Sequence, residues 1–405
     1  MFSQVLPMKN PIQYYEWGSR TAIPELLGIE NPENKPMAEL WMGAHPKAPS
    51  QVLVQKRWES LIDFIRKDPA AVLGRKVYER FGPELPFLLK VLAAQQPLSI
   101  QVHPNRSQAR AGFLREERLG IPIDAPNRNY KDQNHKPELL CALTTFEAMK
   151  GFREPEKISS LLEKVLPSSC AHLLERLTAS PQGRGIRDFF ETLMKMGAQQ
   201  LKALVGSVAE KARKLSAKEK EFQWVVMLHE KYPADPGVLS PLFLNLITLE
   251  PGEAIYLPAG ELHAYLRGMG IEIMANSDNV VRGGLTTKHV DVEELLKVCK
   301  FAPTRVHKIK PETAGFGEQI YRTPAEEFQL SVIRIKGEVM SLGRAGREAS
   351  SIIICTGGEL RVSSESQGEP VKLGSGRSAF IPSLAHPVTL KGRGAAYKAT
   401  VPFSS

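Results

Sequence analysis

The chain has 405 residues, a formal net charge of +9 at pH 7, 42% hydrophobic residues and 24% charged residues. This length and composition are typical of a globular protein with two or three domains and a large core. The basic residues are scattered and lack interleaved aromatic side chains, which argues against a nucleic-acid-binding protein and leaves a solvated surface or a small anionic substrate as reasons for the positive charge.

The four cysteines lie far apart in the sequence and form no Cys-x-x-Cys pair. Their spacing suggests neither a disulfide framework nor a thiolate zinc site, and it favours a reducing compartment. The N-terminus has no basic region followed by an apolar run, and no apolar stretch reaches the roughly 18 residues that a membrane-spanning helix needs. We therefore expect a cytoplasmic protein without a membrane partner.

Short strands between Gly, Pro and Asn signals predict a β-rich beginning over residues 1–57, and residues 58–65 have apolar side chains at helical spacing. The pattern becomes strand-like over residues 85–102, where Lys90 interrupts an apolar run. A charge inside such a run is costly unless its face lines a polar cavity. Lys90 therefore either binds an anion or extends from an edge strand to water.

Gln101 and His103 are two residues apart in this strand, so their side chains point to the same face while Ile100 and Val102 pack behind them. The following Pro-Asn pair ends the strand and predicts a turn. The Gln-x-His pair can hold a metal ion. It can equally be a pair of side chains that hydrogen bond to each other.

A second polar anomaly, Glu138, follows a longer loop and begins the apolar run of residues 139–143. Pro137 favours an extended backbone before it, which fits the start of a strand. If Gln101 and His103 face a shared cavity, Glu138 can supply the anionic metal ligand. Otherwise it begins the strand at the solvent edge.

Apolar residues recur every three or four positions over residues 155–232, which predicts a helical segment inserted between strands. Pro155 fits the first turn of a helix, and Ser216 with Glu219 is typical of a capping box. The aromatic and methionine side chains of this segment follow the buried faces of the helices, so we expect them to form core rather than a cofactor site.

The run of residues 251–263 has turns at both ends of a short apolar strand and ends on His263. A second copy, residues 373–386, has its glycine and proline at the matching positions. Its histidine falls one position early, and no Gln-x-His pair or glutamate precedes it. We therefore expect a second all-β unit that holds no metal ion.

Several blocks together resemble the zinc-dependent mannose-6-phosphate isomerase (phosphomannose isomerase) family, namely residues 101–105, 135–138, 251–263 and 277–286. The third of these blocks looks like the second motif of the cupin jelly rolls. The resemblance implies a mainly β chain with two cupin-type jelly-roll barrels and an α-helical domain. Its expected units are a catalytic jelly roll of residues 1–151 and 233–310, a helical insertion of residues 152–232, and a degenerate jelly roll of residues 311–405.

The resemblance also implies one zinc ion per chain, held by Gln101, His103, Glu138 and His263. It assigns the catalytic arginine to Arg282, and ring opening and proton transfer to His135 and Lys136. Lys90, Arg282 and Lys288 are the candidates to bind a substrate phosphate. Nitrogen and oxygen ligands with one carboxylate suit zinc and leave positive charge beside the substrate.

The implied reaction is the reversible isomerisation of mannose 6-phosphate and fructose 6-phosphate through an enediolate. It requires a group that moves protons and positive charge at the sugar oxygens. A non-catalytic sugar-binding or regulatory cupin is the alternative, and a cupin oxygenase, which usually has a histidine-rich iron site, is a third possibility. We expect a monomer that binds a sugar phosphate and no nucleic acid.

Overall fold

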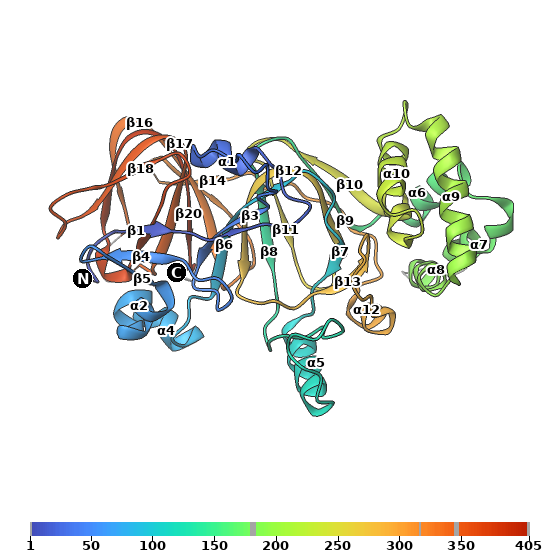
Figure 1. Cartoon of the computed structure of the whole chain (residues 1–405), viewed down its shortest axis with the longest axis horizontal. Helices are drawn as coiled ribbons and strands as arrows, with labels where there is room; N and C mark the ends of the chain where they lie inside the picture. Colours follow the sequence, from blue (N-terminus) through green and yellow to red (C-terminus); the bar gives the residue numbers. More distant parts are fainter. Residues whose placement is uncertain (1, 179–183, 316, 344–347, 403–405) are drawn as a thin grey trace.

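The computed structural model describes residues 2–178, 184–315, 317–343 and 348–402. The strands of the described residues form two ten-stranded sheets. Figure 1 shows the first sheet in the middle, the C-terminal strands at one end and a group of helices at the other. The mainly β fold class with a helical insertion is thereby confirmed, whereas the division into two jelly-roll barrels stays a prediction.

The predicted metal ligands lie on strands of the first sheet or, for His103, directly after one, and the sheet is organised around its longest strand, β12. Its strands are β2 (Ile12–Gln13), β3 (Glu39–Gly43), β6 (Phe87–Ala94), β7 (Ile100–Val102), β8 (Glu138–Ala142), β9 (Phe146–Phe152), β10 (Leu244–Leu249), β11 (Ala254–Leu257), β12 (His263–Ala275) and β13 (Val281–Gly284).

Strand β12 changes partners along its 13 residues. Its first half pairs with β7 and β9, and its second half pairs with β6 and β8. An irregularity between Tyr265 and Arg267 separates the two halves, and such bulges bend a strand and increase its twist. The start of β12 therefore lies beside the ends of several strands that are distant in the sequence.

The second sheet combines the C-terminal strands with three strands from the N-terminal part of the chain. Its strands are β1 (Leu6–Lys9), β4 (Gln51–Val54), β5 (Arg57–Ser60), β14 (Glu312–Gly315), β15 (Glu318–Tyr321), β16 (Gln329–Leu342), β17 (Ser351–Ser364), β18 (Val371–Gly374), β19 (Ser378–Ile381) and β20 (Val388–Thr400).

The N-terminal strands depart from the expected domain limits. Strand β1 pairs with β19, with Leu6 opposite Phe380, although residues 1–151 were assigned to the catalytic jelly roll. The apolar alternation of a short strand predicts which face is buried but not which sheet edge it joins. The three-unit division therefore stays a proposal. In it, strand β1 of the first unit pairs with a strand of the last unit.

The helices lie at the surfaces and ends of the sheets. They are α1 (Ala22–Leu27), α2 (Leu61–Lys67), α3 (Pro69–Leu73), α4 (Arg75–Phe81), α5 (Arg106–Arg118), α6 (Pro155–Glu163), α7 (His172–Thr178), α8 (Arg184–Met194), α9 (Ala198–Leu215), α10 (Lys220–Lys231), α11 (Ser240–Phe243) and α12 (Val292–Val298). No helix among the described residues is long and apolar enough to cross a membrane.

The predicted helical insertion corresponds to α6 through α10, and Pro155 occupies the first turn of α6 as expected. The predicted capping box is wrong. The Ser216 hydroxyl donates to the carbonyl oxygen of Arg213 at the end of α9, and Glu219 pairs with Lys164 instead. Ser216 and Glu219 thus lie between α9 and α10, and each bonds to another residue instead of forming a capping box.

The turn predicted after the Gln-x-His strand is instead the start of a helix. Asn105 caps α5 by accepting from the backbone N–H of Gln108, whose side chain in turn accepts from the backbone N–H of Asn105. This capping box satisfies two backbone groups that the first helical turn leaves free. Similarly, the expected helix of residues 58–65 begins only at Leu61, after β5.

One apolar cluster joins the two sheets. It contains Tyr321 of the second sheet and Phe328, which directly precedes β16, together with Leu139 and Cys141 from the first sheet. Within it the Cys141 thiol lies 3.1 Å from the Tyr321 hydroxyl, which donates to the carbonyl oxygen of Gly252 at 3.0 Å. The buried contacts fix the segment around residues 321–328 against the first sheet.

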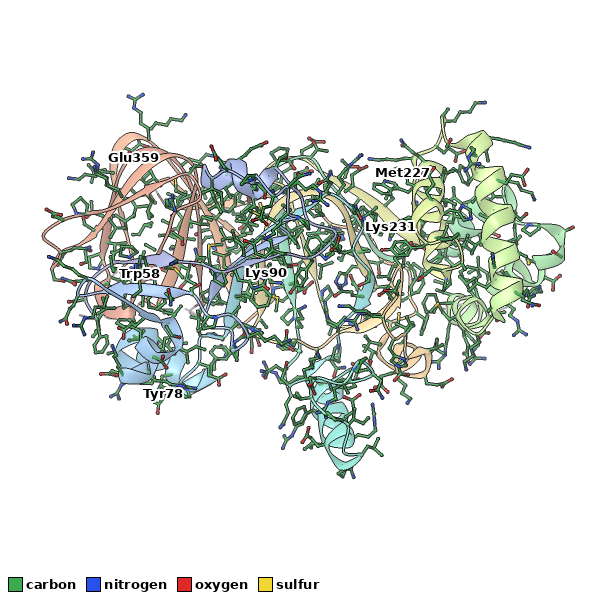
Figure 2. The ribbon with its side chains drawn as sticks, in the orientation of Figure 1. Trp58, Tyr78, Lys90, Met227, Lys231 and Glu359 are labelled. Atoms are coloured by element: carbon green, nitrogen blue, oxygen red, sulfur yellow. The ribbon has the colours of Figure 1, made fainter. Side chains whose placement is uncertain are left out.

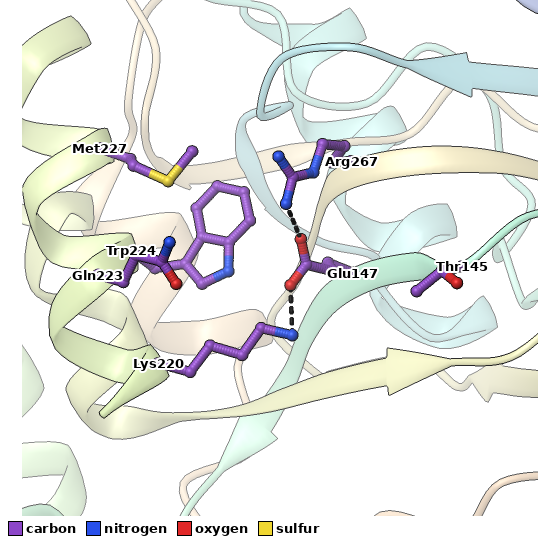
Figure 3. A pocket seen from close by; sticks show the side chains of 7 residues that line it. All are labelled: Thr145, Glu147, Lys220, Gln223, Trp224, Met227 and Arg267. Carbon is purple, nitrogen blue, oxygen red and sulfur yellow. Dashed lines mark hydrogen bonds and ion pairs between the residues drawn. The ribbon is translucent and has the colours of Figure 1, made fainter. Parts of the chain in front are cut away.

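Charged side chains also connect the first sheet to the helical segment. Figure 3 shows Glu147 of β9 between Lys220 of α10 and Arg267 of β12, at 2.5 Å and 2.8 Å, beside the indole of Trp224. A cavity of about 320 Å³ opens at this junction. It contains none of the predicted site residues.

Candidate functional site

The centre of the site is a buried group of three side chains from three strands. His103 follows β7, Glu138 is the first residue of β8 and His263 is the first residue of β12. The Nε2 atoms of His103 and His263 lie 3.3 and 3.4 Å from the two carboxylate oxygens of Glu138. Their ligand atoms all lie within 4.8 Å of one another, as a shared metal ion would require.

The orientation of both imidazoles suits metal binding. Nδ1 of His103 lies 2.8 Å from the carbonyl oxygen of Asn279, and Nδ1 of His263 lies 3.0 Å from that of Glu261. A carbonyl oxygen only accepts, so each Nδ1 carries the proton and each Nε2 presents its lone pair to the cluster. Among the described residues, the buried Nε2 of His103 has no hydrogen-bond partner. These donors fit a zinc ion.

The charges around the cluster keep the ligands in the forms that bind a metal. Burial lowers the pKa of His103 to about 4, against the opposing effect of Glu138, so its imidazole is neutral at pH 7. Burial opposes ionisation of Glu138, but the ammonium of Lys136, at 3.0 Å, holds the pKa of that carboxyl well below its usual value. With 3% of its surface exposed, Glu138 does not lie at a solvent edge.

Gln101 lies beside the cluster in the backbone register. It pairs with His263 of β12 on one side and with Arg282 of β13 on the other. Its amide nitrogen donates to the hydroxyl of Ser99 at 3.3 Å, which leaves its carbonyl oxygen free to act as a ligand. Since His103 bonds to Asn279 instead, the alternative of a Gln101–His103 hydrogen bond is not formed. The role of Gln101 as the fourth ligand stays a prediction.

Lys90 does not face solvent or an edge. Figure 2 places it in the middle of the molecule, on β6, and 6% of its surface is exposed. Its ammonium lies 2.9 Å from Glu272 and 3.4 Å from Glu39. Burial opposes its charge, but these carboxylates raise the pKa of Lys90 above its usual value. The edge-strand alternative is wrong, and the anions that Lys90 contacts belong to the protein, which leaves little charge for a phosphate.

Arg282, unlike Lys90, has no carboxylate partner among the described residues. Its side chain is half-buried on β13, and burial alone lowers its pKa, with no charged partner among the described residues. Lys288 lies nearby and is partly exposed, and its partial burial together with Arg282 and Lys47 lowers its pKa. Lys131 is affected in the same way by burial, Lys47, Arg282 and Lys288, against the opposing effect of Asp278, which pairs with Lys47 at 2.7 Å. We call Lys47, Lys131, Arg282 and Lys288 the cationic rim.

The sequence reasoning missed Lys131 because it lay in a loop without a pattern. Asn279 holds that loop in place. Its side-chain oxygen accepts from the backbone N–H groups of Lys131 and Asp132, and its amide donates to the carbonyl oxygens of Asp132 and Asn134. The same residue's carbonyl oxygen orients His103. Asn279 thus couples the cationic rim to the metal cluster, and only its position inside the block of residues 277–286 signalled it.

His135 lies at the edge of the site and is half-buried. Its Nε2 atom is 2.7 Å from a carboxylate oxygen of Glu327, which comes from the segment before β16. Neither sequence spacing nor residue type signalled that contact.

The structure brings together four of the predicted residues, namely His103, Glu138, His263 and Lys136. It places Gln101 and Arg282 on adjacent strands, and it leaves Lys90 in a separate buried ion pair.

Known proteins resemble this chain over nearly its whole length. The family model described as "Phosphomannose isomerase type I, catalytic domain" matches residues 5–155. The mannose-6-phosphate isomerase of Escherichia coli (strain K12) is 42% identical over 390 residues, which are 95% of this chain and 96% of that protein. The Homo sapiens mannose-6-phosphate isomerase is 33% identical, with 93% of each chain covered.

The fold agrees with a solved structure as well. The crystal structure of mannose 6-phosphate isomerase from Salmonella typhimurium, bound to its substrate fructose 6-phosphate and to zinc, superposes with a TM-score of 0.89 at 41% sequence identity. The superposition covers 98% of this chain and 100% of that one. A second structure, of a zinc-bound mannose 6-phosphate isomerase, gives the same TM-score at 40% identity.

Proposed function

The chain belongs to the type I phosphomannose isomerase family, and we propose from this that it interconverts mannose 6-phosphate and fructose 6-phosphate at a zinc site. The family predicted from the motifs is confirmed. The assignment of individual roles to residues is our proposal, and it is supported by the contacts described above.

We assign the zinc ion to His103, Glu138 and His263, with Gln101 as the fourth ligand. When bound, zinc supplies positive charge that favours negative charge on the sugar oxygens. The observation that supports this most directly is the buried Nε2 of His103, which faces Glu138 and His263 without a hydrogen bond. An unpaired buried nitrogen costs stability unless a ligand occupies it.

The isomerisation moves a proton between two neighbouring carbon atoms. Lys136 is buried beside the cluster, 3.0 Å from Glu138, and it is the candidate base for this step. The enediolate that forms carries negative charge, and the guanidinium of Arg282 is free to donate hydrogen bonds to it because no carboxylate of the described residues neutralises it. His135 is the candidate for opening the sugar ring.

The phosphate of the substrate fits the cationic rim. Arg282, Lys288 and Lys131 influence one another electrostatically, and a dianionic phosphate would relieve the repulsion among them. Lys90 has two carboxylate partners already, so we place the phosphate at the rim and not at Lys90. A monomeric, cytoplasmic enzyme that binds no nucleic acid is part of the same proposal.

The test is a metal analysis paired with an isomerase assay before and after chelation. We expect about one zinc ion per chain and loss of turnover without it. Lys136→Met and Arg282→Ala should each lower kcat by about 100-fold or more, the usual scale for acid–base and oxyanion-stabilising groups. Lys164→Met, which removes an exposed ion pair in the helical segment, is the matched control.

Three outcomes would contradict the proposal. Turnover that survives chelation excludes a zinc enzyme, and turnover that needs oxygen points to an oxygenase. Sugar binding without any turnover in the zinc-loaded protein points to a non-catalytic cupin. Near-normal kcat in both the Lys136 and Arg282 variants would leave the reaction in place but overturn the roles given to these residues.

A further inference from the structure

A buried carboxylate from the C-terminal part of the chain contacts the candidate ring-opening residue. Glu327 lies between β15 and β16, and 5% of its surface is exposed. One of its oxygens, Oε1, lies 2.7 Å from Nε2 of His135 and accepts from the guanidinium of Arg106 at 2.6 Å. His135 and Arg106 belong to the part of the chain that precedes the helical insertion.

The packing around Glu327 leaves this carboxylate little freedom. Its neighbours Ala325 and Phe328, together with Tyr321, belong to the apolar cluster that joins the two sheets. The Tyr321 hydroxyl is bonded to the carbonyl oxygen of Gly252. A side chain held on packed backbone keeps its direction better than one on a free loop. The second sheet therefore presents a fixed carboxylate to the site of the first.

Stability alone does not explain an ionised carboxylate at this position. Burial opposes its charge, but the hydrogen bond from His135 and the nearby charges hold the pKa of Glu327 below its usual value. Its second oxygen, Oε2, is buried with no hydrogen-bond partner among the described residues. Arg106 is more than half exposed, which weakens that ion pair. A carboxylate buried for structural reasons usually has both oxygens bonded.

The contact determines which nitrogen of His135 carries the proton. An ionised carboxylate only accepts hydrogen bonds, and so Nε2 must donate to Glu327. Arg106 also approaches Nε2, at 3.2 Å, but it only donates and cannot share that proton. The neutral imidazole then has its lone pair on Nδ1. The same pairing of a carboxylate with an imidazole fixes ring orientation and tautomer in other enzymes.

We propose that Glu327 is a positioning residue that holds His135 in the Nε2–H tautomer, so that Nδ1 is the atom that exchanges a proton with the sugar. In ring opening, Nδ1 takes the proton of the O1 hydroxyl while the C1–O1 bond becomes a carbonyl. The C1–O5 bond breaks, its electron pair stays on O5, and O5 takes a proton from water. This inference rests on the function proposed above.

The test is a double-mutant cycle on the full-length, zinc-loaded protein, with kcat and KM measured for mannose 6-phosphate. Glu327→Gln keeps the size of the side chain and removes its charge. We expect a kcat lower by about 10-fold, with KM within about 2-fold, and His135→Asn to lower kcat by about 100-fold, since a positioned acid–base group contributes about 10² to 10⁴. In the His135→Asn background, Glu327→Gln should have almost no further effect.

Glu326→Gln is the matched control, because Glu326 is the adjacent carboxylate and pairs with Arg80 at the surface. Denaturation midpoints and zinc content of all variants show whether folding or metal loading has changed. If Glu327→Gln fails to load zinc, Arg106→Gln, which removes only the second partner of the carboxylate, takes its place. It should lower kcat when His135 is present and have no further effect in His135→Asn.

The outcomes separate the two proposals. If His135→Asn leaves kcat unchanged, the role of His135 fails and this inference fails with it. If His135→Asn lowers kcat, and Glu327→Gln lowers kcat by the same factor whether or not His135 is present, Glu327 acts independently of His135. In that case only this inference is overturned. Nitrogen-15 spectra of the imidazoles give a direct readout. The imidazole signal that disappears in His135→Asn should be that of a ring protonated at Nε2. A ring protonated at Nδ1 instead would also overturn this inference.

Discussion

Replacing Lys90 by methionine tests whether this lysine is a structural ion-pair partner or a phosphate ligand. Methionine keeps an unbranched apolar side chain that is one atom shorter and removes the ammonium with its charge. The substitution leaves Glu39 and Glu272 facing each other in the interior without a cation, since both carboxylates are nearly inaccessible to water. We expect the protein to lose stability while the zinc site and the cationic rim keep their charges.

The magnitude follows from the two contacts. At an effective dielectric constant of about 20, Coulomb's law gives about 6 kcal/mol for the 2.9 Å contact with Glu272 and about 5 kcal/mol for the 3.4 Å contact with Glu39. Part of this is recovered when a carboxyl takes up a proton. Breaking a buried pair by removing one partner costs about 3 to 5 kcal/mol in other proteins, and we expect a value in the upper half of that range.

The assay is urea denaturation followed by tryptophan fluorescence, at pH 8 and at pH 5.5. Burial raises the pKa of Glu272 in the folded protein, and removal of Lys90 should raise it further. A carboxyl whose folded pKa lies above its unfolded value takes up a proton on folding, so the folded state gains stability as pH falls. The loss caused by Lys90→Met should therefore be smaller at pH 5.5 than at pH 8.

The double variant Lys90→Met with Glu272→Gln is the control, because it removes one unpaired carboxylate and should recover part of the stability. The competing role gives a different pattern. If Lys90 binds the phosphate, Lys90→Met should raise KM for mannose 6-phosphate by tenfold or more with an unchanged denaturation midpoint. That pattern would refute the ion-pair reasoning.

Glu138→Gln should reduce zinc content from about one ion per chain to well below one, because it removes the only carboxylate of the cluster, as measured by metal analysis after dialysis. Asn279→Ala keeps the backbone carbonyl that bonds to His103 but removes the side-chain hydrogen bonds to the backbone of Lys131, Asp132 and Asn134, so it should lower the free energy of unfolding by about 1 to 3 kcal/mol in urea. Glu147→Gln should cost about 1 kcal/mol at pH 7, since its partners are partly exposed. Burial opposes the charge of Glu147 but Lys220 and Arg267 lower its pKa, so this stabilisation is present above about pH 4.3 and is lost as pH falls further; an equal cost at pH 3.5 would contradict it. Asn105→Ala should destabilise the protein by about 1 kcal/mol in urea, as loss of a helix cap does.

The residues of the metal cluster could be named from the sequence because each sits beside a strong local signal. His103 lies between a strand and a proline, Glu138 lies between a proline and an apolar run, and His263 follows a Pro-Ala-Gly turn. Local signals of this kind fix where a side chain emerges. The three residues meet because β12 pairs with both β7 and β8. The combination of blocks typical of one family predicted that they would meet.

Contacts between distant segments could not be predicted in this way. Lys90 was a recognisable anomaly, but its partners Glu39 and Glu272 lie on β3 and β12, and only strand register brings them together. Glu327 gave no signal, because one acidic residue in a polar segment is ordinary and its contact with His135 depends on how the two sheets pack. Helix α5 was missed for a different reason, since its many charged residues obscure the apolar spacing on which the prediction of a helix depends.

The two copies of the glycine and proline motif separate what the backbone requires from what metal binding requires. Gly252 and Gly376 both have positive φ, 89° and 73°, so both turns need glycine. Around His386, however, the second sheet places Lys398, which pairs with Glu318 at 2.7 Å. Burial and the charge of Lys398 lower the pKa of His386 to about 4.

A metal ion beside His386 would therefore meet a buried ammonium, and the nearby carboxylate of Glu318 is already held by Lys398 and by the Ser331 hydroxyl. In the first sheet the lysine beside the cluster, Lys136, contacts Glu138, and the Nε2 atoms of both histidines still face that carboxylate. The same turn geometry thus leads to a metal-compatible group in only one of the two sheets, because among the described residues only the first sheet brings a second histidine and a carboxylate to its histidine.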